Sequence, residues 1–201
     1  MIKGNFSRQP HSGQLCRRLL VLLWMLLIPL CSLALDQPEP DKQLLSLLRQ
    51  AVNEADSFED RYDAEVWLVA KSTQLKRFIP DEKRRLDLLK MIHREASRAD
   101  ISPEIVLSVI EVESRFDRYA ISRVGAQGLM QVMPFWKKEI GRPGDNLMDA
   151  QTNLRYGCTI LKYYLDREND HLTRALARYN GSTGKTWYPE LVFNAWENRW
   201  R

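Results

Sequence analysis

From about residue 41 onward, apolar residues recur every three or four positions, which is the period of amphipathic helices. No stretch of the sequence alternates apolar and polar residues convincingly, and there is no internal repeat. The pattern predicts helices at about 41–52, 58–78, 81–96, 101–116, 149–167 and 172–179, and a last helix that begins at Pro189. The expected fold class is therefore all-α.

Polar residues interrupt this pattern where helices are expected to begin or end. Asp41 and Asp81 stand at predicted helix starts, and either Asp100 or Ser102 can cap the helix in which Pro103 occupies the first position. Two glycine-containing stretches, 122–134 and 141–146, are expected to be turns or loops, because glycine permits a positive φ and close approach of the backbone.

The first 34 residues form a distinct segment. Arg17 and Arg18 precede the apolar run 19–30, and the small residues Ser32 and Ala34 follow it. A basic start, a short apolar core and a small-x-small exit are typical of a secretory signal. The run is shorter than the roughly 20 apolar residues of a membrane-spanning helix. Cleavage of this leader is favoured, and its retention as an N-terminal anchor in the inner membrane stays open as the alternative.

Charge and cysteine content narrow the function classes. The net charge of +4 comes from the four basic residues of the leader, so that 26 Lys+Arg face 26 Asp+Glu in the remainder. A neutral body predicts no nucleic-acid partner, because binding to phosphates depends on clustered Lys and Arg.

Cys16 and Cys31 lie in the leader, so Cys158 is expected to be alone in the exported chain, as a small buried residue. His93 and His171 have no partner pattern for a metal, and no cofactor is expected.

Two glutamates near the end of the 101–116 helix differ in their expected environment. Glu111 follows Glu104 by seven residues and precedes Arg115 by four, which predicts a solvated stripe with an (i, i+4) ion pair. Glu113 instead continues the apolar row of Val106 and Ile110, and we expect it to face the protein or a cleft. Burial would raise the pKa of this carboxyl group toward that of a general acid. The residues alone allow a structural, hydrogen-bonded glutamate equally well.

Three motifs in order decide between these readings. They are Glu113-Ser114-x-Phe116, the stretch Gly125-Ala126-x-Gly128-Leu129-Met130-Gln131-Val132-Met133-Pro134, and Ala177-Arg178-Tyr179-Asn180-Gly181. Over roughly residues 85–192 the chain resembles the catalytic domain of the soluble lytic transglycosylases, a lysozyme-like, all-helical family that cleaves peptidoglycan.

The resemblance implies a role for each matching residue. Glu113 corresponds to the acid/base, and the substrate-binding positions are Ser122, Met130, Gln131, Tyr179, Asn180 and Tyr188. The family's Asn and Gly four residues apart are present as Asn153 and Gly157. Arg178 stands where the family has Ala, and Gly181-Ser182 alters the Asn-x-Gly motif, which bears on substrate preference. Asp117 is the available second carboxylate, and we interpret it as a helix-end residue.

The resemblance also implies an activity and a location. We expect a leader or anchor at 1–34, a helical adjunct at 35–80 and the lysozyme-like transglycosylase domain at 81–201. The expected reaction cleaves the β-1,4 bond between N-acetylmuramic acid and N-acetylglucosamine and leaves 1,6-anhydro ends, in the periplasm. Peptidoglycan strands are the expected partner, with envelope machinery as a further one. The alternatives are a lysozyme-type muramidase on the same fold and a catalytically idle glycan-binding envelope protein.

Overall fold

The computed structural model describes Ser57 and residues 60–201, which fall within one of the two units of the chain, Pro40–Arg201. The predicted leader, the predicted helix that Asp41 begins and the start of the predicted 58–78 helix lie outside the described residues.

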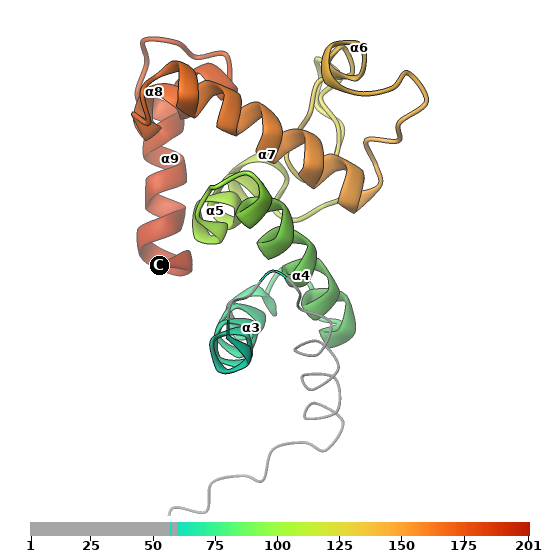
Figure 1. Ribbon diagram of the computed structural model, residues 1–201, viewed down its shortest axis with the longest axis vertical. Helices are drawn as coiled ribbons and strands as arrows, with labels where there is room; N and C mark the ends of the chain where they lie inside the picture. The colour runs from blue at the N-terminus through green and yellow to red at the C-terminus, as the bar shows by residue number, and fades with distance from the viewer. Residues whose placement is uncertain (1–56, 58–59) are drawn as a thin grey trace, which may run out of the picture. The chain divides into compact units, whose positions relative to one another are not determined.

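The described residues are helical, and the prediction of an all-α fold is confirmed. They contain no strand, and only Ile121–Gln127 and Gln127–Val132 form isolated antiparallel bridges. Along the chain (Figure 1) the helices are α3 (Arg61–Leu75), α4 (Glu82–Arg98), α5 (Pro103–Ser114), α6 (Trp136–Ile140), α7 (Ala150–Arg167), α8 (Leu172–Tyr179) and α9 (Trp187–Ala195), followed by the π-helical turn η1 (Trp196–Trp200).

Aspartates begin three of these helices. The side chain of Asp60 accepts hydrogen bonds from the backbone N–H groups at the start of α3, and Asp81 and Asp149 do the same for α4 and α7. Such caps satisfy N–H groups that have no partner within the helix. The predicted starts at Asp81 and Asp149 are confirmed. At α5, Ser102 is the N-cap residue and Pro103 the first helical one, but the Ser102 hydroxyl donates to Glu104 instead of capping.

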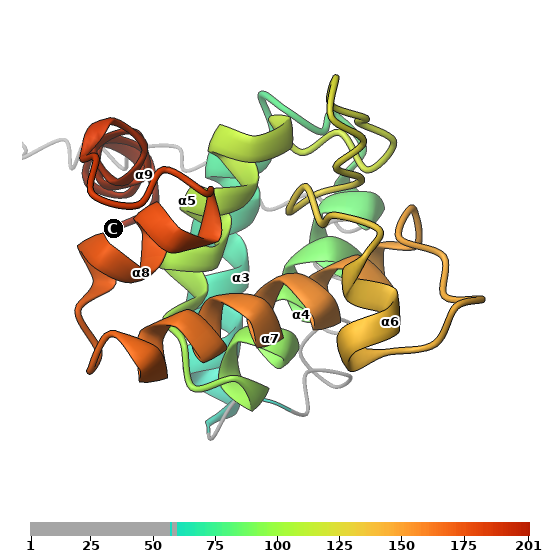
Figure 2. The ribbon, with the colours of Figure 1, turned by 90° about the horizontal axis from the view of Figure 1, so that it is seen from above.

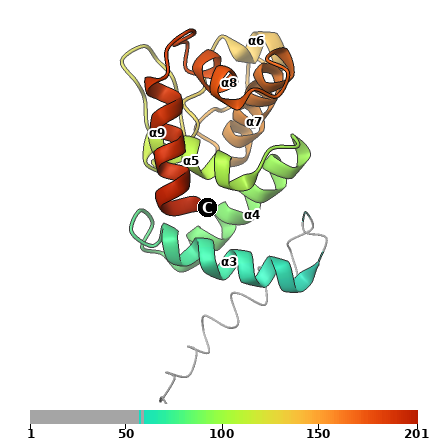
Figure 3. The same cartoon turned by 90° about the vertical axis from the view of Figure 1, so that its left-hand side faces the viewer.

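Helix α5 forms the centre of the core. All six side chains from Ile105 to Ile110 are buried, so this helix is covered on every side. Helices α4 and α9 and the turn η1 pack against it, while α7 packs on both α4 and α8. Figure 2 shows α5 between these elements, and Figure 3 shows α3 lying alongside α4 near the C-terminal end of the chain. The core therefore holds α5 from several directions.

Two predicted boundaries were wrong in detail, and one short helix was not predicted. Helix α5 ends at Ser114 instead of residue 116, because Arg115 and Phe116 have positive φ values of 52° and 67°. The last helix begins at Trp187, two residues before Pro189. Helix α6 was not predicted, since its five residues are too few to show a period.

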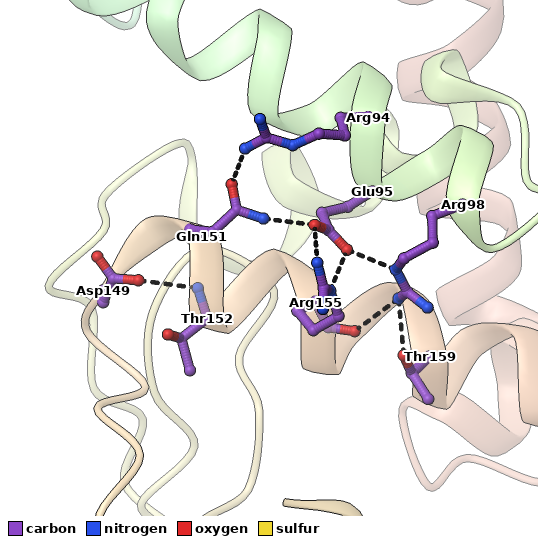
Figure 4. Close-up of polar contacts among 8 residues, drawn as sticks. All are labelled: Arg94, Glu95, Arg98, Asp149, Gln151, Thr152, Arg155 and Thr159. Atoms are coloured by element: carbon purple, nitrogen blue, oxygen red, sulfur yellow. Dashed lines mark hydrogen bonds and ion pairs between the residues drawn. The ribbon is translucent and has the colours of Figure 1, made fainter. Parts of the chain in front are cut away.

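A buried carboxylate joins α4 to α7 (Figure 4). Glu95 is fully buried, and its Oε2 accepts hydrogen bonds from Arg98 Nε at 2.7 Å and Arg155 Nε at 2.6 Å. Gln151 also donates to Glu95, and Arg94 donates to Gln151. Burial alone would raise the pKa of Glu95, but the hydrogen bonds from the two arginines hold it below its ordinary value. The ionised carboxylate therefore connects the two helices.

Candidate active site

Glu113 lies on the last turn of α5, next to the glycine-containing loop 122–134. The hydroxyl of the next residue, Ser114, donates a hydrogen bond to the carbonyl oxygen of Leu129 at 2.8 Å. The same hydroxyl lies 3.1 Å from the carbonyl oxygen of Ile110, which can share this hydrogen bond. The hydroxyl of Tyr188, on α9, donates a hydrogen bond of 2.6 Å to Glu113 Oε1. The end of α5 is thus attached to the loop on one side and to α9 on the other.

The environment of Glu113 favours the protonated carboxyl group. Burial raises its pKa to about 7, and the hydrogen bond from Tyr188 opposes this rise without cancelling it. No ion pair to Glu113 is present among residues 60–201. Near neutral pH both the protonated and the ionised form are therefore populated, so this group can donate a proton or accept one.

A pocket of about 220 Å³ opens beside this carboxyl group. Its wall comes from α5, the loop that follows, α6, α7 and α8. Glu113 is the only carboxylate among the lining residues, which are Glu113, Ser122, Val124, Ala126, Gln131, Val132, Met133, Trp136, Ile160, Tyr179 and Asn180. The structure therefore brings together Glu113 and four of the predicted substrate-binding residues.

Ser122 and Gln131 shape the loop side of the pocket. The Ser122 hydroxyl oxygen accepts a hydrogen bond from the backbone N–H of Ala126 at 3.0 Å. Gln131 has a positive φ of 48°, and its side-chain nitrogen donates to the carbonyl oxygens of Ala120 at 3.1 Å and Gly128 at 2.9 Å. Both side chains fix the course of the loop while they face the pocket.

Tyr179 and Asn180 form the opposite wall, at the end of α8. The Tyr179 hydroxyl donates a 2.7 Å hydrogen bond to the carbonyl oxygen of Met130. Burial, and then the nearby Glu113 carboxyl, raise the pKa of this phenol well above its ordinary value, so that it remains a neutral donor. Asn180 is the C-cap residue of α8. The hydrogen bond from Tyr179 therefore joins the end of α8 to the glycine-containing loop 122–134 beside the pocket.

Met130 and Tyr188 lie behind the pocket wall. Both side chains are fully buried, and neither lines the pocket. Met130 packs against Gly157, where an added Cβ would approach its Sδ to 2.3 Å. Its backbone N–H donates to the side chain of Asn153, and its carbonyl oxygen accepts from Tyr179. Met130 therefore supports the site through its packing and its backbone hydrogen bonds. Tyr188 contributes to the site through the hydrogen bond from its hydroxyl to Glu113.

Asn153 fastens the loop to α7. Its amide nitrogen donates to the carbonyl oxygens of Gln127 and Leu147, at 2.8 Å each. A Cβ at Gly128 would lie 2.4 Å from that nitrogen, and Gly128 has a φ of 76°. Only glycine fits there without displacing buried polar atoms. The resemblance identified Asn153 and Gly157, and their geometry explains the spacing of four residues: both face the loop from one side of α7.

Sequence reasoning did not assign the apolar half of the pocket. Val124, Met133, Trp136 and Ile160 line this half, and the sequence patterns predicted no role for any of them. Ile160 follows Gly157 by three residues and Asn153 by seven, so helical spacing could have placed it on the same face. The surroundings of Trp136 carry no comparable periodic pattern.

The structure also shows the surroundings of three further residues that were discussed from the sequence, namely Glu111, Asp117 and Arg178. The solvated stripe predicted for Glu111 was wrong: its side chain is 11% exposed and pairs with Arg199 instead of Arg115. Asp117 is exposed and accepts a hydrogen bond from the backbone of Tyr119, outside the pocket lining. Arg178 pairs with Glu168, and it also lies outside that lining.

Cys158 is fully buried, as predicted, and burial raises the pKa of its thiol to about 12. No group of three His, Cys, Asp or Glu side chains that could hold a metal ion occurs in the described part of the chain. Every helix in that part is too short or too polar to span a bilayer.

Fold and pocket together define a helical protein with one partly buried, protonatable carboxyl group beside a pocket. The chain belongs to the family of the transglycosylase SLT domain, whose family model matches residues 90–191.

Relatives with similar sequences carry names of the same kind. A transglycosylase of Enterobacteria phage PRD1 is 34% identical over 92 residues, which cover 46% of this chain and 34% of the phage protein. The membrane-bound lytic murein transglycosylase C of Photorhabdus laumondii is 29% identical over 119 residues, which cover 51% of this chain and 33% of that protein.

A crystal structure of the 70-kDa soluble lytic transglycosylase of Escherichia coli matches with 22% identity and a TM-score of 0.44, covering 76% of this chain and 28% of that one. The chain thus spans about a third or less of the length of each of these proteins.

Proposed function

We propose that this protein is a lytic transglycosylase that cleaves the β-1,4 bond between N-acetylmuramic acid and N-acetylglucosamine in peptidoglycan and leaves 1,6-anhydro ends. Membership of the SLT family and the names of the relatives support this assignment. The observation that carries it is the single carboxyl group of the pocket, Glu113, whose pKa of about 7 suits it to act first as an acid and then as a base.

In the first step, protonated Glu113 donates its proton to the glycosidic oxygen. The bond from that oxygen to C1 of the muramoyl sugar breaks, and N-acetylglucosamine leaves with the proton. The pocket contains no second carboxylate to act as a nucleophile or to activate water. We therefore assign assistance at C1 to the 2-acetamido group of the muramoyl sugar, as in other substrate-assisted glycosidases.

In the second step, the Glu113 carboxylate removes the proton from the 6-hydroxyl of the same sugar. That oxygen forms a bond to C1 while the acetamido oxygen leaves C1, which yields the 1,6-anhydro ring and restores protonated Glu113 without consuming water. The hydrogen bond from Tyr188 to Oε1 stabilises the carboxylate between the two steps and leaves Oε2 for the proton transfers.

The other predicted residues receive roles from their positions. Ser122, Gln131 and Asn180 offer polar atoms to the hydroxyl and acetamido groups of a sugar, and the ring of Tyr179 offers a surface for its apolar face. Met130 holds the loop and Tyr179 in register. The apolar side chains Trp136 and Ile160 help to exclude water from the carboxyl group.

We further propose that the protein acts in the periplasm, exported by its leader or held in the inner membrane by it. The composition of residues 1–34 supports export. The relative in Photorhabdus laumondii is named as membrane-bound, which supports a location in the envelope.

Digestion of purified peptidoglycan sacculi, followed by mass spectrometry of the products, tests the proposal. A transglycosylase yields muropeptides that are lighter by one water than the reducing products of a muramidase, and the Glu113→Gln variant yields neither. Reducing ends would establish the hydrolase alternative. Intact sacculi after treatment with the folded wild-type protein would establish the idle glycan-binding alternative.

A further inference from the structure

A second glutamate on the last two turns of α5 is tied to the C-terminal end of the chain. Glu111 Oε2 accepts hydrogen bonds from Arg199 Nε at 2.7 Å and from the indole N–H of Trp200 at 2.8 Å. Arg199 also donates to Glu111 Oε1, so the pair is bidentate, and Arg77 Nη2 lies 3.6 Å from the same oxygen. Bidentate arginine–carboxylate pairs fix orientation as well as distance.

The partners of Glu111 lie outside the segment that matches the family model. Arg77 follows α3, and Arg199 and Trp200 belong to η1, whereas the match covers residues 90–191. Trp200 is fully buried, and its ring contacts Phe116, just beyond the end of α5, with ring centroids 5.4 Å apart. Its carbonyl oxygen accepts a hydrogen bond from Lys71 of α3. The segment 71–77 and the turn η1, which both lie outside the match, thus contact each other and the end of α5.

The same C-terminal run holds α5 on two sides. Tyr188, on α9, binds Glu113, while Arg199 and Trp200, a few turns later, bind Glu111. Residues two apart on a helix point about 200° apart, so the two glutamates project from nearly opposite faces. These contacts restrict both rotation and displacement of the helix end that carries Glu113.

The end of α5 needs such contacts because its backbone leaves the helix abruptly. Arg115 and Phe116 are consecutive non-glycine residues with positive φ, a conformation that costs free energy and persists only where neighbouring contacts enforce it. Phe116 is enforced by its packing on Trp200 and on Phe78, whose ring lies 4.9 Å away.

We propose that the Glu111–Arg199 ion pair is a positioning contact for Glu113, which fixes the last turn of α5 so that the Glu113 carboxyl stays withdrawn beside Tyr188. The effect on catalysis rests on the proposed function, whereas the effect on the carboxyl group itself does not.

Helix α5 also provides a matched control. Glu104, one heptad before Glu111, accepts a hydrogen bond from the indole of Trp67 at 2.6 Å and lies 3.9 Å from Lys71 Nζ. It therefore resembles Glu111 in its partners, an indole and a cation. Glu104 and Glu113 are separated by nine residues, or about 13 Å along the helix. Glu104→Gln should lower stability without changing the environment of Glu113.

The decisive measurement is the pKa of Glu113 in the Arg199→Met protein, followed by NMR of carboxyl-¹³C glutamate and assigned with Glu113→Gln. The groups that face Glu113 are the phenols of Tyr188 and Tyr179, and those that face Glu111 are Arg199 and Arg77. Loss of a cation would by electrostatics alone raise the pKa of Glu113. Loss of positioning hydrates Glu113, and we expect its pKa to fall by about one unit.

A second variant, Arg199→Lys, keeps the charge but loses the bidentate fork, and we expect a smaller fall in the same direction. In digests of soluble glycan strands, Arg199→Met should lower kcat about tenfold with KM little changed, and should move the alkaline limb of activity to lower pH. A pKa of Glu113 that equals or exceeds the wild-type value in folded Arg199→Met protein overturns the inference. If the wild type cleaves no glycan, the proposed function fails while the NMR result still decides this one.

Discussion

The pKa values of two withdrawn carboxyl groups of this protein are shifted in opposite directions. Glu95, between α4 and α7, is fully buried, yet two arginines hold its pKa below the ordinary value. Glu113, at the pocket, is mostly withdrawn from solvent and receives one hydrogen bond from a neutral phenol, and its pKa rises to about 7. The difference teaches that the charge of the partners, more than burial itself, decides whether a withdrawn glutamate connects helices or transfers protons.

The largest expected effect is on catalysis. Glu113→Gln removes the only carboxyl group of the pocket and keeps a similar shape, so the rate of glycan cleavage should fall by about 10³-fold or more. Release of anhydromuropeptides from sacculi measures it. Circular dichroism provides the control, because the variant must keep its helical spectrum. Substantial cleavage by this variant would contradict the role of Glu113.

The same variant should gain stability at alkaline pH. Because the pKa of Glu113 is raised in the folded state, folding favours its protonated form, and stability is lost as the pH rises from the unfolded value of about 4.5 through about 7. A shift of this size corresponds to about 3 kcal/mol above pH 7. Urea unfolding of both proteins at pH 5 and pH 8 measures the difference, which should be larger at pH 8. An equal difference at both values would mean that Glu113 titrates normally.

Glu95→Gln should act in the opposite sense. Replacing the ionised carboxylate weakens its bonds to Arg98 and Arg155, and the free energy of unfolding should fall by about 2 kcal/mol at pH 7. Because the folded-state pKa of Glu95 is lowered, its contribution is complete above the unfolded pKa and is lost as the pH falls through the lower folded-state pKa. In thermal melts the variant should therefore differ from the wild type more at pH 7 than at strongly acidic pH, with glycan cleavage little affected.

The smallest effect is expected from Tyr188→Phe. The hydrogen bond from Tyr188 lowers the pKa of Glu113, so its loss should raise that pKa further and move the alkaline limb of activity to higher pH. The pH profile of cleavage measures the shift. A limb that moves to lower pH would show that the phenol excludes water from Glu113 more than it stabilises the carboxylate.

Much of the site could be predicted from the sequence because its parts are local. The glycines and Gln131 lie within one short loop, Tyr179 and Asn180 are adjacent, and Asn153 and Gly157 share a helix face. The resemblance carried their roles, and the pocket places Ser122, Gln131, Tyr179 and Asn180 around Glu113. The apolar lining was missed because Val124, Trp136 and Ile160 look like ordinary core or loop residues in the sequence.

By itself, the sequence determined the helical period, the helix starts near Asp81 and Asp149 and the inward direction of Glu113, because these depend on residues within a few turns of one another. Only the tertiary structure decided the partner of each carboxylate: Tyr188 for Glu113, Arg199 for Glu111 and Arg155 for Glu95, which lie 75, 88 and 60 residues away. Helical periodicity tells which face of a helix a side chain occupies, but the group that meets that face depends on how distant segments pack.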